Sequence, residues 1–202
     1  MEYLKDIAEI FSGYAFRERV GAFPAGDTAV VQMKNIDSND SLQLDDVPRV
    51  SIPDLNERHL LRPGDLLLRA RGLFHTAAVV TQVIERAIAA APLMVIRVKS
   101  PLVQPAYLRW FLNQQATQAE LVKLAADSHV QNLNKVAIEG LEIPLPPLDR
   151  QSRIATLAEL GMRERALAMM IAEKRAHMIE RKLAQSALAV VPHDATSESR
   201  QP

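Results

Sequence analysis

The sequence predicts an α+β protein in which a mixed globular domain precedes one long helix that forms a coiled coil. Residues 1–148 hold short apolar runs broken by Pro, Gly, Asp and Asn, a pattern typical of strands and short helices joined by turns. From there the chain reaches Val191 without a proline and with a single glycine, Gly161. This change in composition divides the chain into two parts of different architecture.

Three prolines mark the boundary between the two parts. Pro144, Pro146 and Pro147 each lack a backbone donor and fix φ, so they end a strand and favour a stiff extended segment. Asp149 can then cap a helix by accepting a backbone N–H. The predicted parts are a globular domain at residues 1–148, a helix at residues 149–190 and a disordered tail at residues 191–202.

Chain length and amino-acid composition restrict the class of protein. A chain of 202 residues has room for one domain with a sizeable core and an appendage, and 48% hydrophobic with 24% charged residues is typical of soluble proteins. The absence of cysteine excludes disulfides and thiol-based metal or catalytic sites. No apolar run approaches membrane length and the first residues do not resemble a signal peptide, so we expect a cytoplasmic protein without membrane association.

Net charge gives no general indication of nucleic-acid binding. Residues 1–150 contain 16 Lys and Arg against 18 Asp and Glu, and residues 151–202 contain 8 against 6. Phosphate binding requires a local basic surface rather than a basic total. A binding surface must therefore be sought among particular residues.

The elements of the first part follow from the position of apolar and turn residues. Val- and Ile-rich runs predict strands, Pro63 and Gly64 form a turn, and Pro105 suits the first turn of a helix in which Trp110 packs. Residues 37–59 are polar and rich in turn formers, and read as loop. The expected elements are strands at 28–36, 66–71, 77–84, 93–98 and 136–143, and a helix at 105–125.

Two groups of polar residues are candidates for contacts with DNA. Lys34 lies toward the end of the first strand. Arg69 and Arg71 stand one residue apart on another strand, so they share a face that either meets phosphate or is simply solvated. The polar loop at 126–135 offers side chains that can pair with base edges, or that can bond to their own backbone. Its candidates are Ser128, His129, Gln131, Asn132 and Lys135.

The predicted C-terminal helix has an apolar stripe. At about 1.5 Å per residue it would span roughly 60 Å, and a helix of that length with one apolar face must pack along a partner. The stripe consists of Leu157, Leu160, Leu167, Ile171, Met178 and Leu183, whose spacing is not a strict heptad.

Signs of catalysis are absent from the sequence. It has no Gly-rich phosphate loop, no Asn-Pro-Pro-Tyr methylation motif and no nucleophile beside a base. His59, Asp65 and His75 are the best metal ligands available, but they fall on separate elements without tight spacing. We expect no catalytic or metal-binding residue in this chain.

Four blocks of the sequence, taken in order, resemble specificity subunits of type I restriction-modification systems. They are residues 11–16 (FSGYAF), 32–36 (QMKNI), 64–72 (GDLLLRARG) and 143–148 (IPLPPL), the last followed by Gln151. The resemblance implies a target-recognition domain at 1–148 and a helical conserved region at 149–190. A usual specificity subunit carries two of each, so this chain resembles a half-subunit.

The resemblance also implies function and partners. It implies that the stripe forms a homodimer interface, that two recognition domains read a split palindrome in double-stranded DNA, and that the helices dock methyltransferase subunits. Those subunits would use S-adenosylmethionine, so no cofactor is expected in this chain, and a restriction subunit would join indirectly. Lys34, Arg69, Arg71 and Lys135 would contact phosphate or guanine, and the loop residues base edges.

A second hypothesis remains open. The neutral net charge favours a coiled-coil adaptor or decoy that binds modification subunits without recognising DNA. Selection from random DNA separates the two, because an adaptor would enrich no motif.

Overall fold

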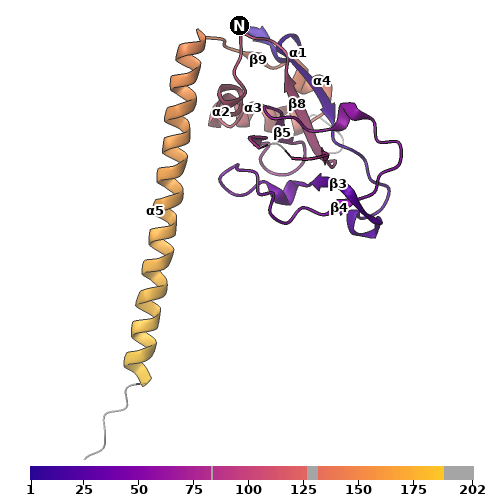
Figure 1. Cartoon of the computed structure of the whole chain (residues 1–202). Helices are drawn as coiled ribbons and strands as arrows, with labels where there is room; N and C mark the ends of the chain where they lie inside the picture. Colours follow the sequence, from indigo (N-terminus) through magenta and orange to yellow (C-terminus); the bar gives the residue numbers. More distant parts are fainter. Residues whose placement is uncertain (83, 127–131, 189–202) are drawn as a thin grey trace, which may run out of the picture. The chain divides into compact units, whose positions relative to one another are not determined.

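The computed structural model describes residues 1–82, 84–126 and 132–188 (Figure 1). The chain divides into two compact units, Met1–Glu159 and Leu160–Pro202. The first unit contains all the strands and the start of the last helix. The elements are β1 (Glu2–Tyr3), α1 (Leu4–Ile7), β2 (Ala8–Ser12), η1 (Val20–Ala22), β3 (Ala25–Val31), η2 (Met33–Asn35), β4 (Arg49–Val50), η3 (Glu57–His59), β5 (Leu66–Arg69), β6 (Ala77–Val79), β7 (Ala87–Ala89), β8 (Leu93–Val98), α2 (Pro105–Leu112), α3 (Gln115–Ala126), α4 (Lys135–Glu139), β9 (Glu142–Ile143) and α5 (Leu148–Leu188). The prediction of an α+β domain followed by a long helix is confirmed.

The central sheet is antiparallel and has the strand order β2-β8-β5-β6. Strands β4, β3 and β7 form a smaller sheet in which β3 and β7 are parallel, and β1 pairs with β9. On β8, Met94 and Ile96 belong to one core cluster with the α2 residue Leu108, whereas Val95 belongs to another with Val31 of β3. The central sheet is therefore buried on both faces, which explains why its strands are almost continuously apolar.

Several predicted elements differ in extent from the observed ones. The strand at 93–98 is confirmed, while those expected at 28–36, 66–71 and 77–84 end earlier, at Val31, Arg69 and Val79. The helix expected at 105–125 is two helices separated at Asn113. The Asn113 side chain accepts from the N–H of Ala77 at 2.8 Å and donates to its carbonyl at 2.9 Å, so it pairs with β6 as a neighbouring strand would.

The strand predicted at 136–143 is wrong over most of its length. Residues Lys135–Glu139 form helix α4, and only Glu142–Ile143 is a strand. Asn134 caps the helix, because its side-chain oxygen accepts from the N–H of Ala137 at 2.8 Å. The β-branched residues in this segment favoured a strand locally, but the cap and the packing of Ile138 in the core favour the helix.

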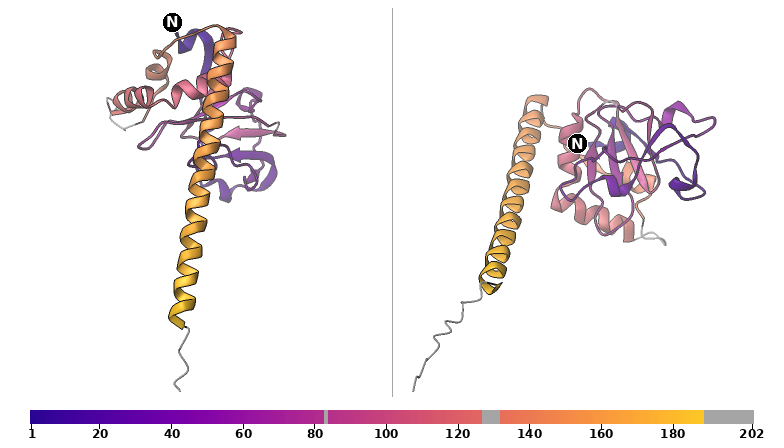
Figure 2. Two further views of the ribbon diagram at one scale, coloured as in Figure 1. Left: turned by 90° about the vertical axis from the view of Figure 1, so that its left-hand side faces the viewer. Right: turned by 60° about the horizontal axis from the view of Figure 1, so that its bottom comes forward.

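The proline segment joins the domain to α5 much as predicted. Helix α5 runs without interruption for 41 residues and begins at Leu148, one residue earlier than expected (Figure 2). Asp149 lies inside the first turn and pairs with Arg153 at 3.1 Å instead of capping the helix. The hydroxyl of Tyr107 donates to the Pro144 carbonyl at 2.7 Å, which ties the extended segment to α2.

Gln151 holds the first turn of α5 on the domain. Its side chain is fully buried, donates to the carbonyls of Leu102 and Pro146 at 2.8 Å each, and accepts from the N–H of Gln104 at 3.0 Å. The last residue of the first unit, Glu159, pairs with Arg109 at 2.9 Å. The first three turns of the helix are therefore part of the domain.

Replacing Gln151 with alanine is expected to lower the free energy of unfolding of the domain by about 2–3 kcal/mol, because a fully buried side chain is removed and three partly buried backbone groups lose their partner. Chemical denaturation measures the change. Arg153→Ala is the matched control on the same turn, since it removes only an exposed ion pair and should leave stability unchanged. Equal stability of both variants would show that water replaces the glutamine.

No helix in the described ranges is both long enough and apolar enough to cross a membrane.

Candidate nucleic-acid interface

Three hollows on the first unit share lining residues and form one connected surface. The largest, of about 790 Å³, and the second, of about 650 Å³, meet at Ala15. The third, of about 280 Å³, shares Pro92 with the first and both Ser12 and Lys135 with the second. We call this surface the basic face and define it by its lining cations, Arg17, Arg19, Lys34, Arg58 and Lys135.

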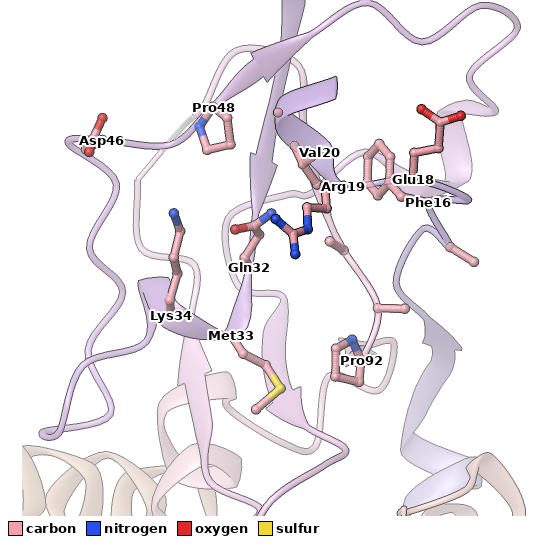
Figure 3. Close-up of a pocket in the computed structure, with 14 residues that line it drawn as sticks. Phe16, Glu18, Arg19, Val20, Gln32, Met33, Lys34, Asp46, Pro48 and Pro92 are labelled. Carbon is pink, nitrogen blue, oxygen red and sulfur yellow. The ribbon is translucent and has the colours of Figure 1, made fainter. Parts of the chain in front are cut away.

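The largest hollow receives polar side chains from two separate segments. Arg19 comes from the segment before η1, and Gln32 and Lys34 follow the end of β3; all three point into the hollow (Figure 3). Residues 90–92, after β7, form a wall. Two cations and an amide thus converge on one cavity, an arrangement suited to phosphate and base edges.

The second hollow depends on a close approach of two backbones. Gly13 donates its N–H to the Leu93 carbonyl at 2.8 Å, and a Cβ on this residue would lie 2.8 Å from the Ala89 carbonyl oxygen. Any side chain here would push the segment carrying Arg17 away from the sheet. The glycine in the FSGYAF block therefore has a structural reason.

His59 lines the second hollow as a neutral ring. Burial lowers its pKa, and the adjacent charge of Arg58 lowers it further, so the imidazole is uncharged at pH 7. The ring packs edge-on against Phe11 and Tyr14, with centroids 6.1 and 6.0 Å away. His59 therefore contributes shape, and the positive charge of this hollow comes from its arginines and lysine.

The basic face is positive although the domain is not. Five Lys and Arg line it against the carboxylates of Glu9, Glu18 and Asp46. Within the described part of the chain, Arg17, Arg19 and Lys34 have no carboxylate within ion-pair distance, whereas Lys135 pairs with Glu139 at 3.5 Å. The local basic surface that composition did not reveal is therefore present.

The predicted arginines have different surroundings. The Arg69 side chain is half-buried, and its guanidinium donates to the carbonyls of Ile36 at 2.5 Å and Asp37 at 3.3 Å. It thereby holds the segment that follows Lys34 against β5. The strand ends at Arg69, so Arg71 does not share a strand face with it; Arg71 is exposed and its backbone pairs with Asn132.

The fold therefore brings together part of the predicted set. Lys34, Asn132 and Lys135 line the connected hollows, and Arg71 adjoins them through Asn132. Ser128, His129 and Gln131 lie outside the described residues. Which of these side chains contact DNA stays a prediction.

Sequence reasoning did not select Arg17, Arg19 or Arg58. The only local signal is Arg17-Glu18-Arg19, which puts two cations immediately after the aromatic FSGYAF block. Nothing in the sequence indicates that these cations lie near Lys34 or Lys135, because only the tertiary fold brings the segments together.

The three residues considered as metal ligands have other roles, of which that of His59 is described above. Asp65 pairs with Arg97, and the Nδ1 of His75 donates to the Arg69 carbonyl at 2.9 Å. No cluster of three or more His, Asp and Glu suited to a metal ion occurs among the residues that the structure describes.

The first unit is thus a mixed domain with a concave basic face, and a long helix with an exposed apolar stripe follows it. The family follows from the sequence comparison: residues 2–158 match the model of the type I restriction modification DNA specificity domain, and the chain belongs to that family. A comparison with curated proteins found no match.

Solved structures share the fold. The HsdS subunit from Thermoanaerobacter tengcongensis is similar over 93% of this chain, with 19% identity and a TM-score of 0.62. A chain from a structure of type I R-M complex assembly and conformational transition is similar over 91%, with 17% identity and a TM-score of 0.60. In both cases the match covers 43% of the other chain, so this chain spans less than half of their length.

Proposed function

We propose that this chain is the DNA-recognition subunit of a type I restriction-modification complex, in a half-length form that dimerises to read a bipartite palindromic site. The exposed stripe of α5 is the observation that carries this proposal. Its six residues are between 50% and 69% exposed, although burial is their ordinary state. They are Leu157, Leu160, Leu167, Ile171, Met178 and Leu183.

The stripe has a heptad register over most of its length. Leu157, Ile171 and Met178 occupy a positions, and Leu160 and Leu167 occupy d positions. Leu183 falls outside this register, on the opposite side of the helix. A second copy of α5 is a suitable partner, because each copy has the same uncovered seam.

Charges within the seam favour an antiparallel pair. Glu164 and Lys174 occupy a and d positions. Parallel helices would place each of them against its own copy, whereas antiparallel helices centred near Met169 place Glu164 against Lys174 and Leu167 against Ile171. In that arrangement the two Glu159 residues would be about 30 Å apart along the axis, close to one turn of B-DNA.

The proposal extends to the partners of the complex. Two domains related by a two-fold axis would read inverted half-sites, and the paired helices would form the platform for methyltransferase subunits, which would bind S-adenosylmethionine. A restriction subunit would join through them. This chain would supply recognition and no catalytic residue.

Light scattering of the full chain should give the mass of a dimer, and Leu167→Asp with Ile171→Asp should give a monomer. Met169→Asp is the matched control, because Met169 is 56% exposed but lies outside the seam. A charge swap tests whether the two helices are antiparallel. Glu164→Lys should weaken the dimer, and adding Lys174→Glu should restore it. A parallel pair would show no rescue, and a monomeric full chain would contradict the symmetric site.

Selection from random DNA tests recognition itself. The full chain should enrich two inverted half-sites separated by a fixed spacer. A dimer that enriches no motif would instead be the adaptor or decoy, which its neutral total charge would suit.

A further inference from the structure

The loop between β5 and β6 exposes two large apolar side chains at its tip. Leu73 is 84% exposed and Phe74 is 64% exposed. Gly72, at φ 119°, makes the bend that turns them outward. We call Leu73 and Phe74 the apolar tip.

The base of this loop is held firmly. Arg69 donates its N–H to the Thr76 carbonyl at 3.0 Å, and the ring of His75 donates to the Arg69 carbonyl at 2.9 Å. The buried side chain of Gln118 accepts from the N–H of His75 and donates to its carbonyl, both at 2.9 Å. The tip is therefore exposed on a well-supported loop and not because the loop frays. Contact of two apolar side chains with water is unfavourable in free energy, and folding of this chain does not remove it.

The apolar tip adjoins the basic face. Leu133 donates its N–H to the Ala70 carbonyl at 2.9 Å, and the backbones of Arg71 and Asn132 pair, so the loop leaves the wall of the third hollow. Arg71, immediately before the bend, is exposed. An apolar tip beside a cation matches the chemistry of a base step with its flanking phosphate.

A protein partner fits this feature less well. Two protruding side chains offer far less apolar area than a stable protein interface needs, which is on the order of 1,000 Å² in total. A gap between two base pairs, in contrast, is about the size of one or two such side chains.

We propose that Leu73 and Phe74 form a wedge that enters the base stack of bound duplex DNA, while Arg71 contacts the adjacent phosphate. The inference rests on the proposed DNA recognition and adds a site of DNA deformation to it. The wedge makes the energy of unstacking one base step part of sequence discrimination, so flexible pyrimidine–purine steps are favoured at that position.

The test uses the full chain and the DNA site obtained by selection, with 2-aminopurine placed at successive positions. Wild-type protein should raise the fluorescence at one step, which reports unstacking. Leu73→Ser with Phe74→Ser should abolish that rise and weaken binding about ten- to a hundredfold, with the salt slope unchanged. Arg71→Ala should keep the rise and lower the slope by about 0.9.

Leu102→Ser is the matched control, because Leu102 is 61% exposed and lines none of the three hollows. No fluorescence rise with wild-type protein, or equal affinity of the double variant, would overturn the wedge while recognition stands. If the double variant binds DNA unchanged but no longer has the mass of a dimer, the wedge is also overturned and the tip belongs to a protein interface. If wild-type protein selects no site, the proposed function fails and the wedge fails with it.

Discussion

Asp65→Asn is expected to lower the free energy of unfolding by about 3–5 kcal/mol, because it leaves the Arg97 guanidinium, whose side chain is only 13% exposed, without its carboxylate. Asp65 is 2% exposed, and its two oxygens accept from the Nε and Nη2 of Arg97 at 2.8 and 2.7 Å. One of them also accepts the N–H of Arg62 at 2.8 Å. The hydrogen bond to Asp65 raises the pKa of Arg97. A guanidinium keeps its proton in proteins even without such a partner, so Arg97 stays charged in Asp65→Asn.

The expected loss is large compared with the total free energy of unfolding of a domain. Single domains unfold at a cost of about 5–15 kcal/mol, so Asp65→Asn removes a substantial fraction of stability. Denaturant unfolding at constant m-value measures it. The control is Glu9→Gln, whose pair with Lys99 is 3.9 Å long and about half exposed on both sides, so no measurable change is expected. A loss below about 1 kcal/mol for Asp65→Asn would mean that water solvates Arg97 in place of the carboxylate.

Arg19→Ala with Lys34→Ala is expected to reduce DNA affinity about a hundredfold at low salt, because two charge-assisted contacts to phosphate are lost. Both side chains point into the largest hollow, and neither has a carboxylate within ion-pair distance among the described residues. Binding of the double variant would also release fewer counterions from the DNA. The slope of log K against log salt should therefore fall by about two in magnitude.

Titration at several salt concentrations measures both quantities. Lys5→Ala with Arg153→Ala is the control of equal charge, since neither residue lines the hollows. Equal effects of the two pairs would indicate attraction by total charge alone. An unchanged slope for Arg19→Ala with Lys34→Ala would remove the basic face from the interface.

The GDLLLRARG block shows how a motif can be recognised correctly while its residues are assigned differently. Its Asp65 and Arg69 are buried or half-buried and hold backbone segments in place. Arg71 alone points to solvent, next to the apolar tip. The same holds for Gln151, which belongs to the proline boundary motif and proves to be the fully buried clamp of the first helical turn.

Features that depend on neighbouring residues were predictable. The proline segment, the continuous helix α5 and the strand at 93–98 follow from φ restriction, donor loss and apolar periodicity, which act over a few residues. The apolar stripe likewise needs only the helical repeat. These properties predict, from the sequence alone, that a long helix follows a mixed domain.

Features that depend on distance in space required the fold. Residues 135–139 became helical because Asn134 caps them and Ile138 enters the core. The basic face exists because β2, β3 and β7 bring Arg17 and Arg19 to the same surface as Lys34 and Lys135, up to 118 residues apart in the chain. Charge attraction and burial depend on separation in three dimensions, so a one-dimensional pattern carries the residue types but not the surface they form.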